Sequence, residues 1–283
     1  MKNKIINVIG LGYIGLPTAT ILAKEGFKVF GTDIDQKTVD TINKGKSHIL
    51  EPELDMYVSK AILSGNLKAS TIPKKGDVYI ICVPTPFYKN HKSPKPNISY
   101  ILTAVKSIAK LIKPNDLIIL ESTSPVGTTK RIQDELTNAG VINKNVHIAY
   151  CPERVLPGKI IEEFIDNDRI VGGLTKKATK LASEFYKTFV KGLVLETDAK
   201  TAEMCKLTEN SFRDINIAFA NELSMICDKE KIQVWDLIQL ANHHPRVNIL
   251  QPGPGVGGHC IAVDPWFIVN KDFKNSKLIR TSR

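Results

Sequence analysis

The sequence of 283 residues lacks the features that mark exported and membrane proteins. Its longest apolar segment, residues 78–83, is far shorter than the roughly 20 apolar residues that a membrane-spanning helix needs. The opening residues MKNKIINVIG contain no apolar core of a signal peptide. We therefore expect a cytoplasmic protein that does not insert into a membrane.

Cysteine and histidine are too few and too scattered to predict a disulfide framework or a metal site. The five cysteines are an odd number without a CxxC pair, and the six histidines show no HExxH spacing. Cys82, Cys205 and Cys227 are interpreted as core residues, because an isolated cysteine is most often a small buried side chain. No metal ligands are predicted.

The formal net charge is +10, but the lysines are spread along the chain rather than gathered in a block. Such a surface attracts anionic ligands, including nucleotides and phosphorylated sugars. A solvated, lysine-rich surface explains the same composition equally well. Because the positive charge lacks the clustering or aromatic platform of nucleic-acid-binding proteins, nucleic acid is not an expected partner.

Short apolar runs alternate with helical patterns in the first part of the chain, which is typical of a parallel sheet with crossover helices. The predicted strands are residues 5–9, 29–32, 78–83, 117–120, 146–149 and 169–171. Helices are predicted for PTATILAKEG, SYILTAVKSIAKLI and GTTKRIQDELTNAG. The pattern predicts an α/β fold, with a Rossmann-type doubly wound parallel sheet in a domain of residues 1–198.

From residue 199 the pattern changes to AKTAEMCKLTENSFRDINIAFANELSMICDKEK, which contains no Gly or Pro. Its apolar positions recur at helical spacing, and it is longer than an ordinary globular helix. We expect residues 199–283 to form an all-helical central domain, whose long helix spans a domain boundary or makes dimer contacts. The next segment, NHHPRVNILQPGPGVGGHC, is predicted to be a loop because of its Pro and Gly residues.

The segment VIGLGYIGLP has the glycine spacing of a dinucleotide-binding turn directly after an apolar strand. The residues expected at the cofactor there are Gly10, Gly12, Tyr13, Ile14 and Gly15. Asp33 ends the second predicted strand, where an acid hydrogen-bonds a ribose 2′-hydroxyl and repels a 2′-phosphate. The pattern therefore favours NAD over NADP, although a glycine turn beside a surface aspartate is the alternative.

Two later loops follow strands at the edge where open α/β sheets bind ligands. These are VPTP, with Pro84 and Thr85, and ESTSPVG, with Thr123. We expect these three residues to line the cofactor site. Ordinary proline-bearing turns are the alternative.

Cys260 lies in GPGVGGHCIAVDP, where glycines rather than packing residues surround the thiol. Backbone N–H groups and nearby cations stabilise a thiolate. Lys206, Asn210 and Arg213 lie at helical spacing on one face of the long helix, where a lysine and an amide can stabilise an oxyanion. The alternative is that these three residues form only a solvated helical stripe.

An NAD site together with a cysteine nucleophile suggests a four-electron route from alcohol to acid. Hydride removal gives an aldehyde, and the thiol adds to it. A second hydride removal leaves a thioester, which water hydrolyses.

Six motifs occur in one order and resemble the nucleotide-sugar 6-dehydrogenases, which oxidise UDP-glucose, GDP-mannose or UDP-N-acetylhexosamines to uronic acids. They are GLGYIGLP, VPTP, ESTSPVGTT, CPERVLPG, TAEMCKLTENSFRDINIAFANEL and GVGGHCIAVDP. The resemblance covers essentially the whole chain. It implies an NAD-dependent enzyme that acts as a homodimer through the long helix.

The resemblance also implies roles for individual residues. The catalytic set would be Cys260 as nucleophile, Lys206 and Asn210 at the oxyanion, Asp264 near the hydrolytic water, and Glu153 with Thr123 in proton and water handling. The substrate-binding set would be Arg154, Val155, Lys206, Asn210, Arg213, His243, Arg246 and Gly257. Of these, Arg246 would enter the neighbouring subunit's substrate site.

UDP-N-acetyl-D-mannosamine is the substrate that the resemblance favours, with UDP-N-acetylglucosamine or UDP-glucose as alternatives. The product would be a uronate for surface polysaccharides. A two-electron β-hydroxyacid dehydrogenase is a more distant alternative, because it needs no cysteine.

The family usually continues for about one further domain, which binds UDP. The expectation is that this C-terminal domain is absent here. The chain would then bind NAD but turn over weakly, because much of the binding energy comes from the nucleotide end. A catalytically silent NAD-binding fragment is the alternative of another class.

Overall fold

The structure is a computed structural model that describes residues 3–88, 94–141, 145–258 and 260–283. The chain divides into two compact units. The sheet unit comprises Met1–Thr85, Asn97–Thr123 and Gly127–Glu203, and the helical unit comprises Pro86–Pro96, Ser124–Val126 and Met204–Arg283. The division falls inside one long helix, directly after Glu203.

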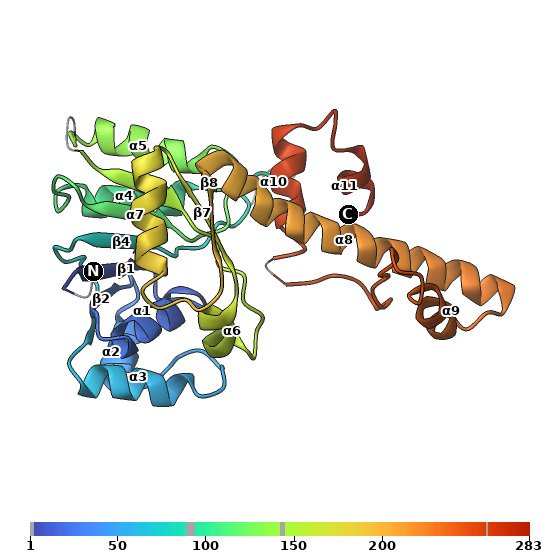
Figure 1. The fold of residues 1–283 in the computed structure, drawn as a ribbon, viewed down its shortest axis with the longest axis horizontal. Helices are drawn as coiled ribbons and strands as arrows, with labels where there is room; N and C mark the ends of the chain where they lie inside the picture. The colour runs from blue at the N-terminus through green and yellow to red at the C-terminus, as the bar shows by residue number, and fades with distance from the viewer. Residues whose placement is uncertain (1–2, 89–93, 142–144, 259) are drawn as a thin grey trace. The chain divides into compact units, whose positions relative to one another are not determined.

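Within the described residues, the sheet unit contains one eight-stranded sheet in the order β3-β2-β1-β4-β5-β6-β7-β8 (Figure 1). The strands are β1 (Ile5–Ile9), β2 (Lys28–Thr32), β3 (Leu67–Ser70), β4 (Val78–Ile81), β5 (Leu117–Leu120), β6 (His147–Tyr150), β7 (Arg169–Gly173) and β8 (Val194–Asp198). The pairs from β3 to β6 are parallel, but β7 is antiparallel to β6. The Rossmann-type fold is confirmed, with the correction that the sheet is not parallel throughout.

All six predicted strands are present, with small differences at their ends. The two edge strands, β3 and β8, are not among the predicted strands. An edge strand has one partner and is less covered, so its apolar signal is weak. In β8, no residue is fully buried, and the sequence VLETD is largely polar.

Helices cover both faces of the sheet because the strands bury alternate residues on opposite sides. In β4, Val78 and Ile80 join one core cluster, whereas Tyr79 and Ile81 join the other. The first cluster includes side chains of α1 (Gly15–Lys24), α2 (Gln36–Asn43), α3 (Leu54–Leu63), α6 (Ile160–Asp166) and α7 (Lys176–Tyr186). The second includes α4 (Ser99–Ala109) and α5 (Thr128–Asn138), drawn in green in Figure 1.

The long helix α8 (Ala199–Glu230) has 32 residues and confirms the predicted long helix. The N-terminal part of α8 is anchored by Glu203, whose buried carboxylate caps the N-terminus of α5. The carboxylate accepts hydrogen bonds from the Gly127 N–H at 2.6 Å, the Thr129 N–H at 2.7 Å and the Thr129 hydroxyl at 2.6 Å. A carboxylate at a helix N-terminus is stabilised by the free N–H groups and the helix dipole.

The rest of the helical unit consists of α9 (Val234–Ala241), α10 (Asp264–Lys271), α11 (Lys277–Thr281) and connecting loops. Three asparagines pin the predicted loop between α9 and α10. Asn216 bonds the backbone of Asn248 and Leu250, Asn242 bonds Ile249, and Asn221 accepts from the Gly253 N–H at 2.9 Å. Among the described residues, no helix is both long and apolar enough to cross a membrane.

Candidate active site

The predicted cofactor residues lie at one edge of the sheet. The strands β1, β2, β4, β5 and β6 are parallel, so the segments that follow them emerge at the same edge. These segments are the glycine-rich turn, Asp33, the VPTP loop, the ESTSPVG loop and the CPER segment. The fold therefore brings the predicted cofactor residues of the sheet unit, Thr123 and Glu153 to one region.

The glycine-rich turn fits a dinucleotide because its three glycines meet different surroundings. A Cβ at Gly15 would lie 1.8 Å from the Gly10 carbonyl oxygen, so helix α1 packs directly against the turn. Gly10 has φ +90°, and a Cβ there would lie 2.9 Å from the Cys82 carbonyl oxygen. At Gly12 a Cβ would meet nothing within 4 Å in the described residues. This open position leaves room for a pyrophosphate to approach the backbone.

Asp33 both supports the turn and offers oxygen atoms to a ligand. Its Oδ2 accepts from the Leu11 N–H at 2.9 Å, and its Oδ1 accepts from the Asp35 N–H at 3.0 Å. Each carboxylate oxygen can accept a second hydrogen bond. The side chain is thus fixed in place and can also bind ribose hydroxyls.

The two threonine loops are joined to each other. The Thr85 hydroxyl donates to the Thr123 carbonyl oxygen at 2.6 Å, and the Ser122 hydroxyl donates to the Val83 carbonyl oxygen at 2.7 Å. Pro84 lies exposed between these contacts. The cofactor-side loops after β4 and β5 therefore form one hydrogen-bonded wall.

Glu153 is buried and held by charged and backbone partners. Its Oε2 accepts from Arg169 Nη1 at 2.6 Å, and its Oε1 accepts from the Arg154 N–H at 2.7 Å. The Arg154 guanidinium donates to the Asp168 carbonyl oxygen at 3.1 Å. Val155 is half-buried against the core beneath it.

A second buried acid, Glu121, lies in the same region of the core. Its carboxyl group accepts from the Tyr186 hydroxyl at 2.6 Å, the Thr18 hydroxyl at 3.1 Å and the Cys82 thiol at 3.2 Å. Burial and the charge of Glu153 raise the pKa of Glu121. Glu121 is the first residue of ESTSPVG, and nothing in the local sequence pattern distinguishes this buried glutamate from an exposed one.

Glu51 is another residue that the sequence analysis missed. Its carboxylate accepts from the Tyr13 hydroxyl at 3.1 Å and from the N–H groups of Gly158 and Ile160, both at 2.9 Å. It therefore connects the glycine-rich turn to the loop that follows Val155. These segments are more than a hundred residues apart in sequence, so no local signal predicts the contact.

The helical unit brings together the residues predicted around the cysteine. Asn210 Nδ2 donates to Asp264 Oδ2 at 2.5 Å, and both side chains are buried. Asp264 is the first residue of α10, and its N–H donates to the Cys260 carbonyl oxygen at 2.9 Å. The turn that carries the thiol is thus connected directly to the start of α10 and, through Asp264, to α8.

The electrostatics of this group differ from the expectation of a stabilised thiolate. Cys260 is exposed, yet desolvation of the thiol and the charge of Asp264 raise its pKa above 9.0, while Lys206 and Arg213 act in the opposite direction. Burial raises the pKa of Asp264 to about 6, against the effects of Asn210 and Lys206. At neutral pH the group therefore contains a protonated thiol and an ionised aspartate.

The glycines around the thiol leave space. A Cβ added at Gly253, Gly255, Gly257 or Gly258 would meet nothing within 4 Å in the described part of the chain. Gly258 also has φ +83°, a conformation that favours glycine. A bulky ligand can therefore approach this side of the loop.

His243 and Arg246 lie elsewhere in the helical unit. Both are exposed on the segment after α9, which packs against the C-terminal part of α8, whereas α10 lies along its earlier part (Figure 1). The Arg246 N–H donates to His244 Nδ1 at 3.3 Å. The structure thus gathers Lys206, Asn210, Cys260 and Asp264 and places His243 and Arg246 apart from them.

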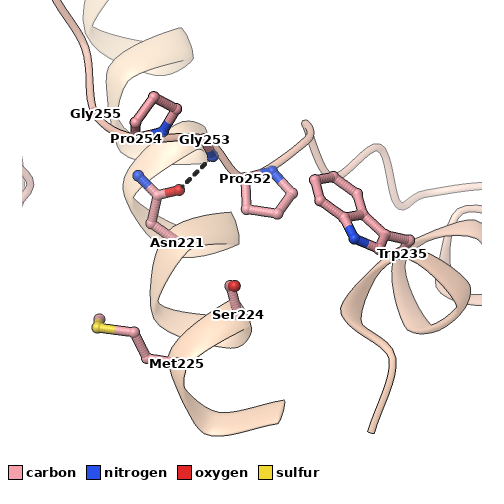
Figure 2. Close-up of a pocket in the computed structure, with 8 residues that line it drawn as sticks. All are labelled: Asn221, Ser224, Met225, Trp235, Pro252, Gly253, Pro254 and Gly255. Carbon is pink, nitrogen blue, oxygen red and sulfur yellow. Dashed lines mark hydrogen bonds between the residues drawn. The ribbon is translucent and has the colours of Figure 1, made fainter. Parts of the chain in front are cut away.

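A cavity of about 580 Å³ lies between α8, α9 and the Pro- and Gly-rich loop. Figure 2 shows the Trp235 indole beside Pro252, with Asn221 bonded to Gly253 and Met225 further along α8. None of the predicted catalytic residues lines it. All five cysteines are free, and no group of three or more His, Cys, Asp or Glu side chains suited to a metal occurs among the described residues.

A Rossmann-type sheet, a glycine turn open toward a pyrophosphate and an acid after the second strand define an NAD-dependent dehydrogenase. Residues 4–190 match the NAD binding domain of the UDP-glucose/GDP-mannose dehydrogenase family, and residues 200–281 match its central domain. The chain belongs to this family. The predicted family, enzyme class and cofactor are confirmed.

Named relatives extend the comparison. The UDP-N-acetyl-D-mannosamine dehydrogenase of Campylobacter jejuni is 57% identical over 98% of this chain and 70% of its own. The NDP-N-acetyl-D-galactosaminuronic acid dehydrogenase of Ralstonia nicotianae is 55% identical over 98% and 67%. The solved UDP-D-ManNAc dehydrogenase of Pyrococcus horikoshii has a TM-score of 0.93 and 42% identity, over 98% and 67%. The chain thus spans about two thirds of the length of these proteins.

Proposed function

We propose that this protein catalyses the NAD-dependent four-electron oxidation of UDP-N-acetyl-D-mannosamine to UDP-N-acetyl-D-mannosaminuronate. The observation that carries the proposal is the exposed Cys260 on an open glycine loop, connected to the buried Asn210–Asp264 pair. A two-electron dehydrogenase has no use for such a thiol. The product would serve the synthesis of surface polysaccharides, and the supply of NAD and UDP-sugars favours the cytoplasm.

Two NAD molecules, bound one after the other, would each accept one hydride from the sugar C6, and the first oxidation would also release the proton of the C6 hydroxyl. After the first step, the Cys260 sulfur adds to the aldehyde and its proton leaves, because the thiol is protonated at neutral pH. Asp264, which is ionised above about pH 6, is the base that we assign to this proton. The product is a thiohemiacetal on Cys260.

Lys206 and Asn210 would stabilise the oxygen of the thiohemiacetal as negative charge develops on it. The Asn210 side chain is held for this role by its hydrogen bond to Asp264. Removal of the second hydride leaves a thioester. Water then attacks the acyl carbon, with Glu153 and Thr123 as the proposed partners of that water, and the acid leaves Cys260 as a thiol.

The remaining assignments concern binding. We propose Gly10, Gly12, Tyr13, Ile14, Gly15, Asp33, Pro84, Thr85 and Thr123 for NAD. For the UDP-sugar we propose Arg154, Val155, Arg213, His243, Arg246 and Gly257. Arg246 is exposed and apart from the Cys260 group, as a residue that serves a second subunit would be.

The choice of sugar is supported by names of relatives and is tested directly by kinetics. Relatives of nearly equal identity are named for N-acetyl-D-mannosamine and N-acetyl-D-galactosaminuronic acid. The assay compares kcat/KM for UDP-linked N-acetylmannosamine, N-acetylglucosamine, N-acetylgalactosamine and glucose, using the complete gene product. The highest value for N-acetylmannosamine supports the proposal, and a preference for another sugar overturns the substrate assignment.

A silent NAD-binding module is the second candidate, because the residues proposed for NAD lie in the sheet unit, whereas Cys260 lies in the helical unit. Calorimetry on residues 1–283 separates the two functions. Binding of NAD without UDP-sugar favours the module, whereas binding of both ligands favours the enzyme.

We also propose a homodimer through α8. Large apolar side chains are exposed along this region, including Phe212 at 65%, Met225 at 63% and Trp235 at 53%. The cavity in Figure 2 lies on the same stretch of α8 and could receive a side chain of a second copy. Sedimentation should show a dimer that dissociates in Met225→Lys, and a wild-type monomer at micromolar concentration would contradict the proposal.

A further inference from the structure

Arg169 is the only arginine with a fully buried side chain in the described residues, being 1% exposed. A buried guanidinium is costly unless its charge and its N–H groups are matched. Here Nη1 donates to Glu153 Oε2 at 2.6 Å and Nη2 donates to the Phe164 carbonyl oxygen at 2.8 Å, whereas the buried Nε has no hydrogen-bond partner among the described residues. The guanidinium carbon also lies 4.3 Å from the centre of the Phe164 ring and 5.5 Å from that of Tyr186.

The reversal of β7 explains how Arg169 reaches Glu153. In the antiparallel pairing, Ala149 faces Gly173 and Tyr150 faces Gly172. If this register is continued past the end of β6, Glu153 falls opposite Arg169. In a wholly parallel sheet the first residue of β7 would instead lie at the opposite edge, away from the cofactor segments.

The two contacts fix the carboxylate of Glu153 almost completely. Arg169 holds Oε2, and the Arg154 N–H holds Oε1 at 2.7 Å. Arg169 itself cannot swing away, because a backbone carbonyl and two aromatic rings surround its planar group. Only the second lone pair of each Glu153 oxygen is left for a proton or a water.

We propose that Arg169 is a positioning residue, which holds the Glu153 carboxylate in the orientation that catalysis requires. This inference rests on the proposed role of Glu153. The proposed role gives a functional reason for the antiparallel direction of β7. Arg169 acts through Glu153 and not by direct contact with substrate or cofactor.

A double-mutant cycle on the complete gene product tests the kinetic part. Arg169→Lys keeps the charge but cannot maintain both contacts of the guanidinium, so kcat should fall about tenfold or more. KM for the UDP-sugar and Kd for NAD should stay within about threefold of the wild-type values. The substitution displaces the Glu153 carboxylate and leaves the binding surfaces unchanged. In a Glu153→Gln background the same substitution should change kcat by less than about twofold.

An unchanged kcat in Arg169→Lys would overturn the inference. An equal loss of kcat in the wild-type and Glu153→Gln backgrounds would also overturn it, because it would show a general structural effect of the substitution. Arg131→Lys, at an exposed arginine of α5, is the matched control and should leave kcat unchanged. Arg169→Met removes the charge as well and should lower kcat further than Arg169→Lys does. If Arg169→Met does not fold, the test rests on Arg169→Lys alone.

Whether Arg169 fixes the orientation of the Glu153 carboxylate can be tested without measuring activity. A crystal structure of Arg169→Lys should show the Glu153 carboxylate rotated away from its present position, whereas an unchanged carboxylate overturns the inference. If wild-type enzyme turns over no nucleotide sugar, the proposed function fails, and this structure still decides whether Arg169 positions Glu153. If turnover occurs but Glu153→Gln does not lower kcat, the role of Glu153 fails instead.

Discussion

The edge of the sheet and the cysteine loop hold their functional residues in different ways. At the sheet edge, Asp33, Glu153 and Thr85 are each fixed by hydrogen bonds to backbone or buried side chains. In the cysteine loop, four glycines face open space and the thiol is exposed. The side chains of the first region are fixed by internal hydrogen bonds, whereas the second region has open space beside an exposed thiol.

This difference fits two kinds of ligand chemistry. A rigid binding site suits a dinucleotide, because little conformational entropy is lost when the ligand binds to side chains that are already fixed. A thiol that forms and breaks a covalent bond to a bulky sugar needs access, and its reactivity depends on the charges nearby. Substitutions in the rigid region should therefore have larger effects than changes to the charged group around Cys260.

The largest effect is expected at the glycine-rich turn. Gly15→Ala places a methyl group 1.8 Å from the Gly10 carbonyl oxygen, so it should separate α1 from the turn and abolish NAD binding. Gly12→Ala faces open space and should leave the melting temperature within about 2 °C of wild type, while it weakens NAD binding by about tenfold or more. Calorimetry and thermal unfolding measure both variants. Normal NAD affinity in Gly15→Ala would contradict a preformed cradle.

The next effect is expected at the anchor of α8. Glu203→Ala removes a buried carboxylate that accepts hydrogen bonds from the Gly127 and Thr129 N–H groups and the Thr129 hydroxyl, so the free energy of unfolding should fall by about 3 kcal/mol. Glu222→Ala, at an exposed glutamate of the same helix, is the control and should change it by less than about 0.5 kcal/mol. Urea denaturation compares the two variants, and equal effects would show that Glu203 is not an anchor.

A smaller effect concerns the pH dependence of stability. The folded protein keeps the Asp264 proton up to about pH 6, whereas the unfolded chain loses it near 3.8. The folded state therefore binds more protons in this window, and the free energy of unfolding falls as pH rises from 4 to 6. Between pH 4 and 6, the free energy of unfolding of wild type should fall by on the order of 2 kcal/mol more than that of Asp264→Asn. Parallel curves for the two proteins would show that Asp264 titrates normally.

The smallest effect is expected in the reactivity of the thiol. Asp264→Asn removes a charge that raises the pKa of Cys260, so alkylation by iodoacetamide at pH 8 should become about threefold faster. Lys206→Met removes a charge that lowers this pKa and should slow the reaction by a similar factor. Peptide mass spectrometry follows Cys260 against the buried Cys151 and Cys227. Changes of the same sign in both variants would exclude a simple effect of charge.

Local patterns predicted the parts of the molecule that depend on local chemistry. Glycine spacing predicted the tight turn between β1 and α1, and helical spacing placed Lys206 and Asn210 on one face of a long helix that the structure contains. The sequence could not predict that β7 runs antiparallel, because strand direction depends on the path of the connection and not on the strand's residues. For the same reason it missed the Glu153–Arg169 and Glu51 contacts, whose partners come together only in the fold.

The sequence also could not predict the raised pKa of Cys260. Glycine-rich surroundings suggested stabilisation by N–H groups, but the net shift depends on desolvation and on the distance to Asp264. Those are properties of the folded loop.

The covalent role of Cys260 is tested most directly by mass spectrometry of enzyme quenched in acid during turnover of UDP-N-acetyl-D-mannosamine. The peptide with Cys260 should gain the mass of the substrate less four hydrogens, as a thioester does, and Glu153→Gln should increase the amount of this modified peptide. Steady turnover to the uronate with unmodified Cys260, and equal turnover by Cys260→Ala, would contradict it.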